Sequence, residues 1–221
     1  REALRLEPQS TFAKTLLTDC AYNLANQTRG EDPAGAEALY RECLGHLGDV
    51  LEHNADALPS LEMACRARTS LGALCATQQR FAEALAEFQQ ARVITERLFA
   101  AQPPTPRLLR NAAILNYNTG SLLVETDADL PGAIECLRTA VRYGEQALSS
   151  SPQDPRAVAL VLGHQVRLAT FAEMLDPASA ANEWQAAHQL VGGAAATLQR
   201  RLEADEGSRF DIVCAARGLA A

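Results

Sequence analysis

The chain has 221 residues, which is long enough for one or two globular domains with a substantial core. Its 48% hydrophobic and 21% charged residues exclude a disordered chain, and no apolar run approaches the roughly 18 residues of a membrane-spanning helix. A net charge of −7 argues against nucleic acid as a partner, because nucleic-acid binders need clustered cationic surface.

The composition also indicates the fold class. Alanine and leucine dominate while β-branched residues are few, and this mixture favours helix over strand. Lys14 is the only lysine among the 20 basic residues, which we attribute to the codon usage of a GC-rich, bacterial genome. The chain begins Arg1-Glu2-Ala3 without an initiator methionine or a leader, so we interpret it as a fragment of a longer protein.

In chain order, the sequence predicts four helical hairpins followed by a short capping helix. The second helices of the first and last hairpins begin at Asp32-Pro33 and Asp176-Pro177, where an N-cap acid precedes a proline at the first helical position. Asp129-Leu130-Pro131 is a looser form of the same signal. Prolines also separate each hairpin from the next. The predicted ranges are 9–56, 60–101, 106–150 and 155–204 for the hairpins and 208–219 for the cap.

One pattern recurs in the second helix of every hairpin: a small residue, a large apolar residue four later, and a small residue three later again. Ala84, Phe88 and Ala91 are the clearest example. Neighbouring helices approach closely only at small side chains, and the large side chain fills the groove between them. A spacing of about 48 residues between copies, with no shift in composition, predicts one continuous all-α solenoid over residues 1–221. The other copies are Ala36, Tyr40, Cys43; Ala133, Leu137, Ala140; and Ala180, Trp184, Ala187.

The second hairpin resembles the tetratricopeptide (TPR) repeat. The matching residues are Leu71, Gly72, Cys75, Phe81, Ala84, Phe88 and Ala91. The resemblance implies a right-handed superhelix whose first helices line a concave groove. The spacing departs from the usual 34-residue unit, and this longer form resembles the repeats found downstream of the catalytic domain in many bacterial serine/threonine protein kinases. The chain itself contains no Gly-rich loop, HRD or DFG motif, so any kinase activity would lie outside it.

The same resemblance implies a row of partner-binding residues on the first helices. Each first helix is predicted to carry a Leu-Gly pair, or a variant of it, on its apolar face: Leu24-Ala25, Leu71-Gly72, Thr119-Gly120 and Leu168-Ala169. The residue before each pair is polar, and the equivalent residues are Asn23, Ser70, Asn118 and Arg167. An asparagine there can hydrogen-bond the backbone of an extended peptide, and an arginine can hold a carboxylate. The alternative is that these side chains cap loops or face solvent. The residues expected to share the surface are Tyr22, Asn26, Arg66, Tyr117 and Ser121.

The sequence contains no pattern typical of catalysis, a metal or a cofactor. Cys43 and His46 have a spacing that suits two ligands on one helix, but no second pair completes a site. His164 and His188 belong to one predicted hairpin, and we expect surface or boundary positions for them. GxSxG, HExxH and Walker motifs are absent, so we expect no enzyme. The six cysteines lack CxxC spacing and are expected to be buried thiols rather than disulfides; they are Cys20, Cys43, Cys65, Cys75, Cys136 and Cys214.

These observations predict a non-catalytic module that binds a partner protein or peptide, as the regulatory region of a bacterial signalling protein. Two alternatives are a domain that senses a small ligand and a module that self-associates into homo-oligomers. An exposed apolar patch on a terminal hairpin would favour self-association. The unpatterned cysteines favour the cytoplasm, whereas the kinase resemblance also allows an extracytoplasmic position on a membrane-anchored kinase.

Overall fold

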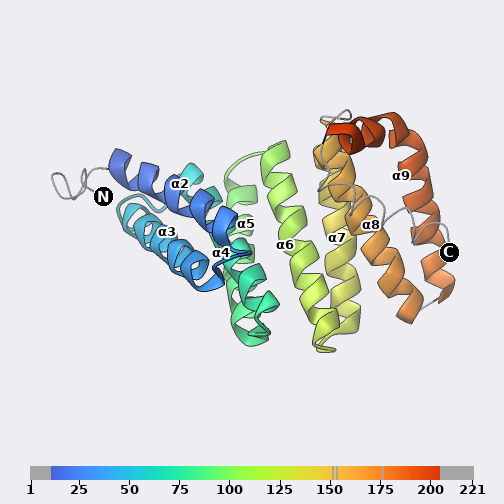
Figure 1. Ribbon diagram of the computed structural model, residues 1–221, viewed down its shortest axis with the longest axis horizontal. Coiled ribbons are helices and arrows are strands. Elements are labelled where there is room, and N and C mark those ends of the chain that lie inside the picture. The colour runs from blue at the N-terminus through green and yellow to red at the C-terminus, as the bar shows by residue number, and fades with distance from the viewer. Residues whose placement is uncertain (1–10, 151, 153, 176, 205–221) are drawn as a thin grey trace. The chain divides into compact units, whose positions relative to one another are not determined.

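The computed structural model describes residues 11–150, 152, 154–175 and 177–204 (Figure 1). Over these residues the fold is all-α, and they contain no strand. Four pairs of consecutive helices are present. They are α2 (Thr11–Thr28) and α3 (Pro33–His53), α4 (Leu58–Thr77) and α5 (Phe81–Ala101), α6 (Pro106–Glu125) and α7 (Leu130–Ser149), and α8 (Pro155–Leu175) and α9 (Pro177–Ala204).

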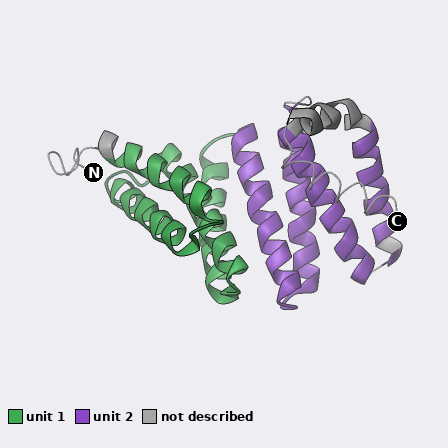
Figure 2. Cartoon of the chain, in the orientation of Figure 1, with its two compact units in different colours: residues 1–104 green, residues 105–221 purple. Residues whose placement is uncertain are grey.

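The helices pack in sequence. Each first helix packs on the second helix of its own hairpin, and α3 packs on α4 as α7 packs on α8. This sequential packing confirms the predicted all-α hairpins and is compatible with an α-solenoid. The chain divides into two compact units, residues 1–104 and 105–221, each containing two hairpins (Figure 2). A single continuous array stays a prediction, and the expected cap at 208–219 lies outside the described residues.

The helix starts follow from the capping residues that the sequence contains. Asp32 Oδ1 accepts a hydrogen bond from the Gly35 N–H at 2.9 Å, and Asp129 Oδ1 accepts one from the Gly132 N–H at the same distance. A proline occupies the first turn in both helices. The predicted starts of α3 and α7 are therefore confirmed, whereas Asp176 lies outside the described residues.

The repeated small residues lie where helices are in closest contact. A Cβ placed on Gly72 would come within 2.6 Å of the Phe88 ring, and one on Gly120 would come within 2.9 Å of Leu137. Neither glycine has room for a side chain, so helices α4 and α5, like α6 and α7, approach as the pattern predicts. The small residue that opens each pattern is buried in all four hairpins: Ala36, Ala84, Ala133 and Ala180.

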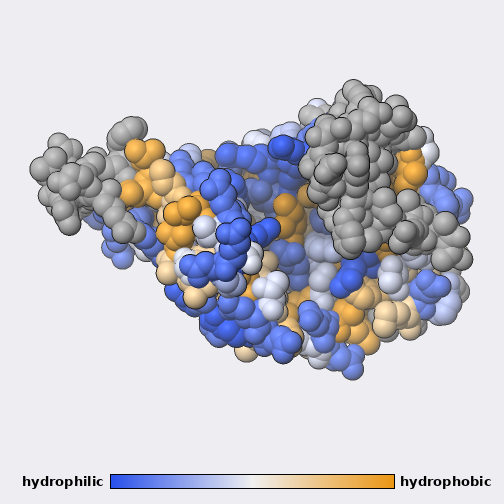
Figure 3. Space-filling model, viewed as in Figure 1, coloured by the Kyte–Doolittle hydropathy of each residue, from blue (hydrophilic) through white to orange (hydrophobic). Residues whose placement is uncertain are grey.

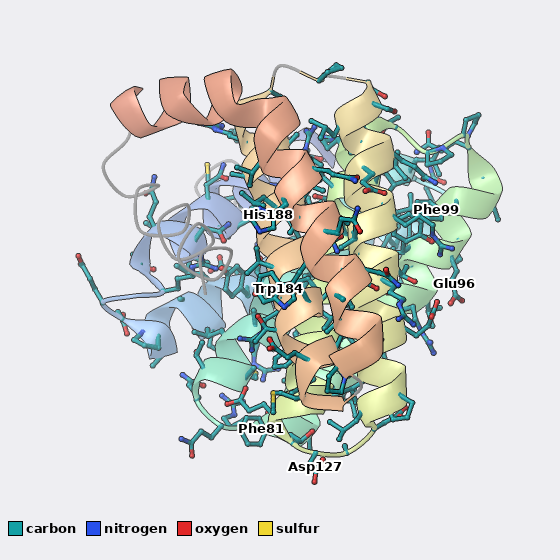
Figure 4. All side chains as sticks on the ribbon, turned by 90° about the vertical axis from the view of Figure 1, so that its right-hand side faces the viewer. Phe81, Glu96, Phe99, Asp127, Trp184 and His188 are labelled. Carbon is teal, nitrogen blue, oxygen red and sulfur yellow. The ribbon has the colours of Figure 1, made fainter. Side chains whose placement is uncertain are left out.

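Two large apolar residues, one on a first helix and one on a second helix, depart from full burial. Leu24 was expected on the apolar face of its helix, but 47% of its surface is exposed, so that prediction is wrong. Trp184 is half-buried, and its indole N–H donates to Glu173 Oε2 at 3.3 Å. Trp184 and His188 project from the same side of α9, one turn apart (Figure 4).

Candidate functional site

In unit 1, a predicted site tyrosine links the first helices of the two hairpins. The Tyr22 ring of α2 is buried, and the Arg66 guanidinium of α4 lies over it with its central carbon 4.6 Å from the ring centre. The Tyr22 hydroxyl and the Ser70 hydroxyl of α4 are 3.4 Å apart. The structure therefore brings together three of the five site residues predicted in this unit, with Tyr22 beneath Arg66 rather than on the surface.

Asn26 completes this cluster from the turn after Tyr22. Its side-chain oxygen accepts a hydrogen bond from the Tyr40 hydroxyl at 2.9 Å, and its amide donates to the Tyr22 carbonyl at 2.9 Å. The Tyr22 and Tyr40 rings have centres 6.0 Å apart, and burial raises the pKa of Tyr40. Because both ends of the Asn26 amide are engaged, its role in the described structure is to fix the tyrosines.

In unit 2, Tyr117 of α6 occupies the same repeat position as Tyr22 and contacts α8 instead. Its ring stacks on the His164 ring with centres 4.5 Å apart and planes 17° from parallel. His164 is only 6% exposed, so its expected surface or boundary position is wrong, whereas His188 is exposed. Burial lowers the pKa of His164 to about 4, although a hydrogen bond to the Ala140 backbone acts in the opposite direction. The imidazole is therefore neutral at pH 7.

The two arginines of the predicted site share one arrangement. Arg167 of α8 is exposed, and its guanidinium carbon lies 4.2 Å from the centre of the Phe171 ring, as Arg66 lies over Tyr22. Neither makes an ion pair or a hydrogen bond with the residues that the structure describes. Other arginines do form ion pairs: the Arg68 guanidinium lies 2.8 Å from the Glu87 carboxylate. A guanidinium on a ring face keeps its N–H groups free at the edge, where they suit a carboxylate.

The polar row before each Leu-Gly pair keeps unused hydrogen-bonding capacity. Asn23 is exposed and Asn118 is half-buried, and neither side chain bonds to another described residue. Ser121 differs, since its hydroxyl oxygen is buried and has no partner among the described residues. Asn23, Asn118, Arg66 and Arg167 are thus the predicted residues whose polar groups remain available for a ligand.

Sequence reasoning missed the partners that hold these groups in place. Tyr40 was assigned to packing, His164 to the surface or its boundary, and Phe171 to no role, yet they contact and orient Asn26, Tyr117 and Arg167 respectively. One signal in the sequence indicates that such contacts exist. Tyr22 and Tyr117 each stand three residues before the small residue of the Leu-Gly pair or its variant, so each tyrosine was positioned to contact the next hairpin.

The described residues contain no group of three or more histidines, cysteines or acids that could hold a metal ion. Burial raises the pKa of Cys43 to about 12, so this thiol stays protonated. Cys43, Cys65 and Cys75 are buried and free, which confirms the expected packing role for these three. Cys136 is half-buried, Cys20 is exposed, and Cys214 lies outside the described residues.

The chain matches no protein-family model, and no curated protein matches it in sequence. Within the part of the chain that the structure describes, every helix is too short or too polar to cross a membrane.

Proposed function

We propose that the chain is a non-catalytic, TPR-like interaction module that binds a carboxylate-bearing peptide or segment of a partner protein through its first helices. The observation that carries the proposal is the state of Arg66 and Arg167. Each is held over an aromatic ring, and each lacks a carboxylate partner among the described residues. Both come from the first helix of a second hairpin, α4 in unit 1 and α8 in unit 2.

The electrostatic context supports a ligand at these arginines. The chain has 27 acidic and 20 basic residues, so carboxylates are abundant, and Arg68, Arg80 and Arg138 each pair with one. An arginine that stays unpaired in an acidic chain is available to an external acid. The ring beneath restricts the guanidinium before binding, so less side-chain entropy is lost when the ligand arrives.

The neighbouring asparagines extend this recognition along a peptide. Asn23 in unit 1 and Asn118 in unit 2 offer both a donor and an acceptor, which matches the alternating groups of an extended backbone. In each unit, one arginine would bind a carboxylate of the peptide and one asparagine would hydrogen-bond its main chain. Sensing of a small ligand by the same groups is the alternative.

The wider role rests on the resemblance to TPR regions attached to bacterial serine/threonine kinases. We propose that this module docks a partner, or senses one, for such a kinase, and that it operates in the cytoplasm. The free thiols of Cys20, Cys43, Cys65 and Cys75 support a reducing compartment, because oxidising compartments favour paired cysteines. An extracytoplasmic position on a membrane-anchored kinase is the alternative.

The test uses a peptide array that presents acidic peptides beside the same peptides with amidated carboxylates. The wild-type chain should bind the acidic members and lose affinity for the amidated ones. The Asn118→Ala, Arg167→Ala double variant should then bind about tenfold or more weakly in a titration, since a charge-assisted hydrogen bond contributes about 1.5–3 kcal/mol. Its melting temperature should change little, because Arg167 is exposed, Asn118 is half-buried, and neither side chain bonds to another described residue.

Arg142→Ala is the matched control. Arg142 also lies near an aromatic ring, with its guanidinium carbon 5.5 Å from the Tyr143 ring centre, but it belongs to the second helix α7. Removing it should leave the affinity unchanged. The proposal is wrong if no acidic peptide binds, or if the double variant binds normally while its melting temperature falls.

A further inference from the structure

Helix α2 carries an apolar stripe that the described structure leaves uncovered. Leu16 is 54% exposed and Leu24 is 47% exposed, and the exposed thiol of Cys20 lies midway between them. Residues four apart lie on one face of a helix, so the three side chains form a continuous line. Figure 3 shows apolar side chains gathered along α2.

The equivalent face of α8 is a helix-packing face. Leu160, His164 and Leu168 stand nine, five and one residues before Ala169, as Leu16, Cys20 and Leu24 stand before Ala25. A Cβ on Gly144 of α7 would lie 3.6 Å from Leu160. His164 stacks on Tyr117, and Leu168 joins a buried cluster with Leu137 and Val141. In α8, therefore, the preceding hairpin covers this face.

Helix α4 gives the same result in unit 1. Its residues at the same positions are Met63, Ala67 and Leu71; Met63 is half-buried, and the other two are fully buried in a helix that packs on α3 of the preceding hairpin. The exposed stripe of α2 therefore has the position and the apolar character of a face that packs against helices. A leucine left half-exposed there retains apolar area whose burial is favourable.

We propose that α2 of a second copy of this chain covers the stripe, in a two-fold symmetric dimer. The stripe is self-complementary, because a leucine lies four residues on each side of Cys20. An antiparallel pairing places Leu16 of each protomer against Leu24 of the other, and the small cysteine at the crossing point lets the helices approach closely. This inference does not rest on the proposed function, since it uses none of the ligand-binding residues.

The charge of α2 also favours a second copy. The whole chain carries −7, which opposes association of two copies, but Thr11–Thr28 contains only Lys14 and Asp19 as charged residues. Lys14 is buried, and its ammonium pairs with Asp49 of α3 at 3.1 Å. The stripe therefore lies on a helix without net charge. Stable interfaces bury about 1,200–2,000 Å², so a contact built on three residues per protomer should dimerise weakly, in the micromolar range or above.

Sedimentation of the 221-residue chain from low micromolar to several hundred micromolar concentration tests the dimer. The wild type should shift from monomer to dimer, and the Leu16→Glu, Leu24→Glu double variant should remain monomeric with an unchanged helical circular dichroism spectrum. Val93→Glu is the matched control, because Val93 is 55% exposed on α5, outside the stripe. It should dimerise like the wild type.

A short bismaleimide cross-linker locates the interface directly. In a Cys136→Ser, Cys214→Ser background, Cys20 is the exposed thiol among the described residues, and the cross-linker should join two copies into a covalent dimer. Adding Cys20→Ser should abolish that product. The proposal is overturned if the wild type stays monomeric over this concentration range. It is also overturned if the leucine variants still dimerise, or if Val93→Glu disrupts the dimer equally.

Discussion

Tyr22 in unit 1 and Tyr117 in unit 2 occupy the same position of their repeats, but they contact chemically different partners. Tyr22 lies beneath the half-buried guanidinium of Arg66. Tyr117 stacks on His164, which is buried and neutral at pH 7. The same helix-to-helix contact is therefore partly solvated in unit 1, whereas in unit 2 it is buried and contains a titratable imidazole.

A one-residue difference in register accounts for the contrast. Arg66 stands six residues before Gly72, whereas His164 stands five residues before Ala169. One residue turns a side chain by about 100° around the helix, so Arg66 reaches the edge of the contact and His164 enters it. A guanidinium without a carboxylate partner must keep contact with water, while a neutral imidazole can be buried. Two units built from the same repeat thus differ in how deeply the side chain that contacts the tyrosine is buried.

The largest expected effect comes from replacing the partner of each tyrosine, His164 or Arg66, by alanine in separate variants. His164→Ala should lower the free energy of unfolding by about 3 kcal/mol, because it leaves a cavity beside the Tyr117 ring. Arg66→Ala should cost less than about 1 kcal/mol, since water replaces most of what the exposed part of the side chain contacts. Chemical denaturation of both variants measures the difference. Equal costs would mean that the two contacts are energetically alike.

A second prediction concerns acid stability, and its sign follows from the pKa of His164. The folded pKa is about 4, below the unfolded value of 6.5, so protonation favours the unfolded chain. The neutral form contributes full stability above pH 6.5, and this contribution is lost as the pH falls towards 4. From these two values, the loss should reach about 2 kcal/mol at pH 5.

The control for this prediction is the His164→Gln variant, whose denaturation midpoint should no longer depend on pH through this group between pH 6.5 and 4. In unit 1, the stability contributed by Glu37 is lost over a lower pH range. Hydrogen bonds from Arg80 and then Arg41 lower the pKa of Glu37 to about 2, so its contribution is present above pH 4.5 and is lost as the pH falls towards 2. A wild-type midpoint that stays flat between pH 6.5 and 5 would contradict the role given to His164.

The comparison also shows what could be read from the sequence. The helix starts at Pro33 and Leu130 were predictable because a cap and a proline act within one turn. The buried Ala84 and Ala133 were predictable because the repeated pattern marks the close approach of two helices. Both signals are local, or they recur at the repeat interval, and this is why they can be recognised without a structure.

The burial of His164 and the exposure of Leu24 could not be predicted in the same way. Histidine suits both surface and core, so its position is decided by whether a neighbouring hairpin covers that face. Leu24 has the residue type of a packing position, but its exposure depends on what lies over α2. The availability of Arg66 and Arg167 depends on which carboxylates the fold brings near, which spacing along the chain does not reveal.

The smallest expected effect concerns the turns after α4 in unit 1 and after α6 in unit 2, which have the same backbone geometry. Gln79 after α4 and Asp127 after α6 both have positive φ, at 61° and 49°. In each turn the following N–H bonds a carbonyl five residues back, from Arg80 to Cys75 and from Ala128 to Leu123. This is the helix ending at which glycine is usually found, because other residues adopt the left-handed region at a cost.

The two residues should respond differently to replacement by glycine. Gln79→Gly should raise the free energy of unfolding by about 0.5–1 kcal/mol, because it relieves the left-handed strain by more than it adds unfolded-state entropy. Asp127→Gly should change it by less than about 0.5 kcal/mol, since aspartate tolerates this conformation better than glutamine does. Denaturant titration of both variants, with the exposed Gln90→Ala as a control for surface substitution, measures the difference. A destabilised Gln79→Gly would show that the glutamine side chain contributes more to this turn than its backbone strain costs.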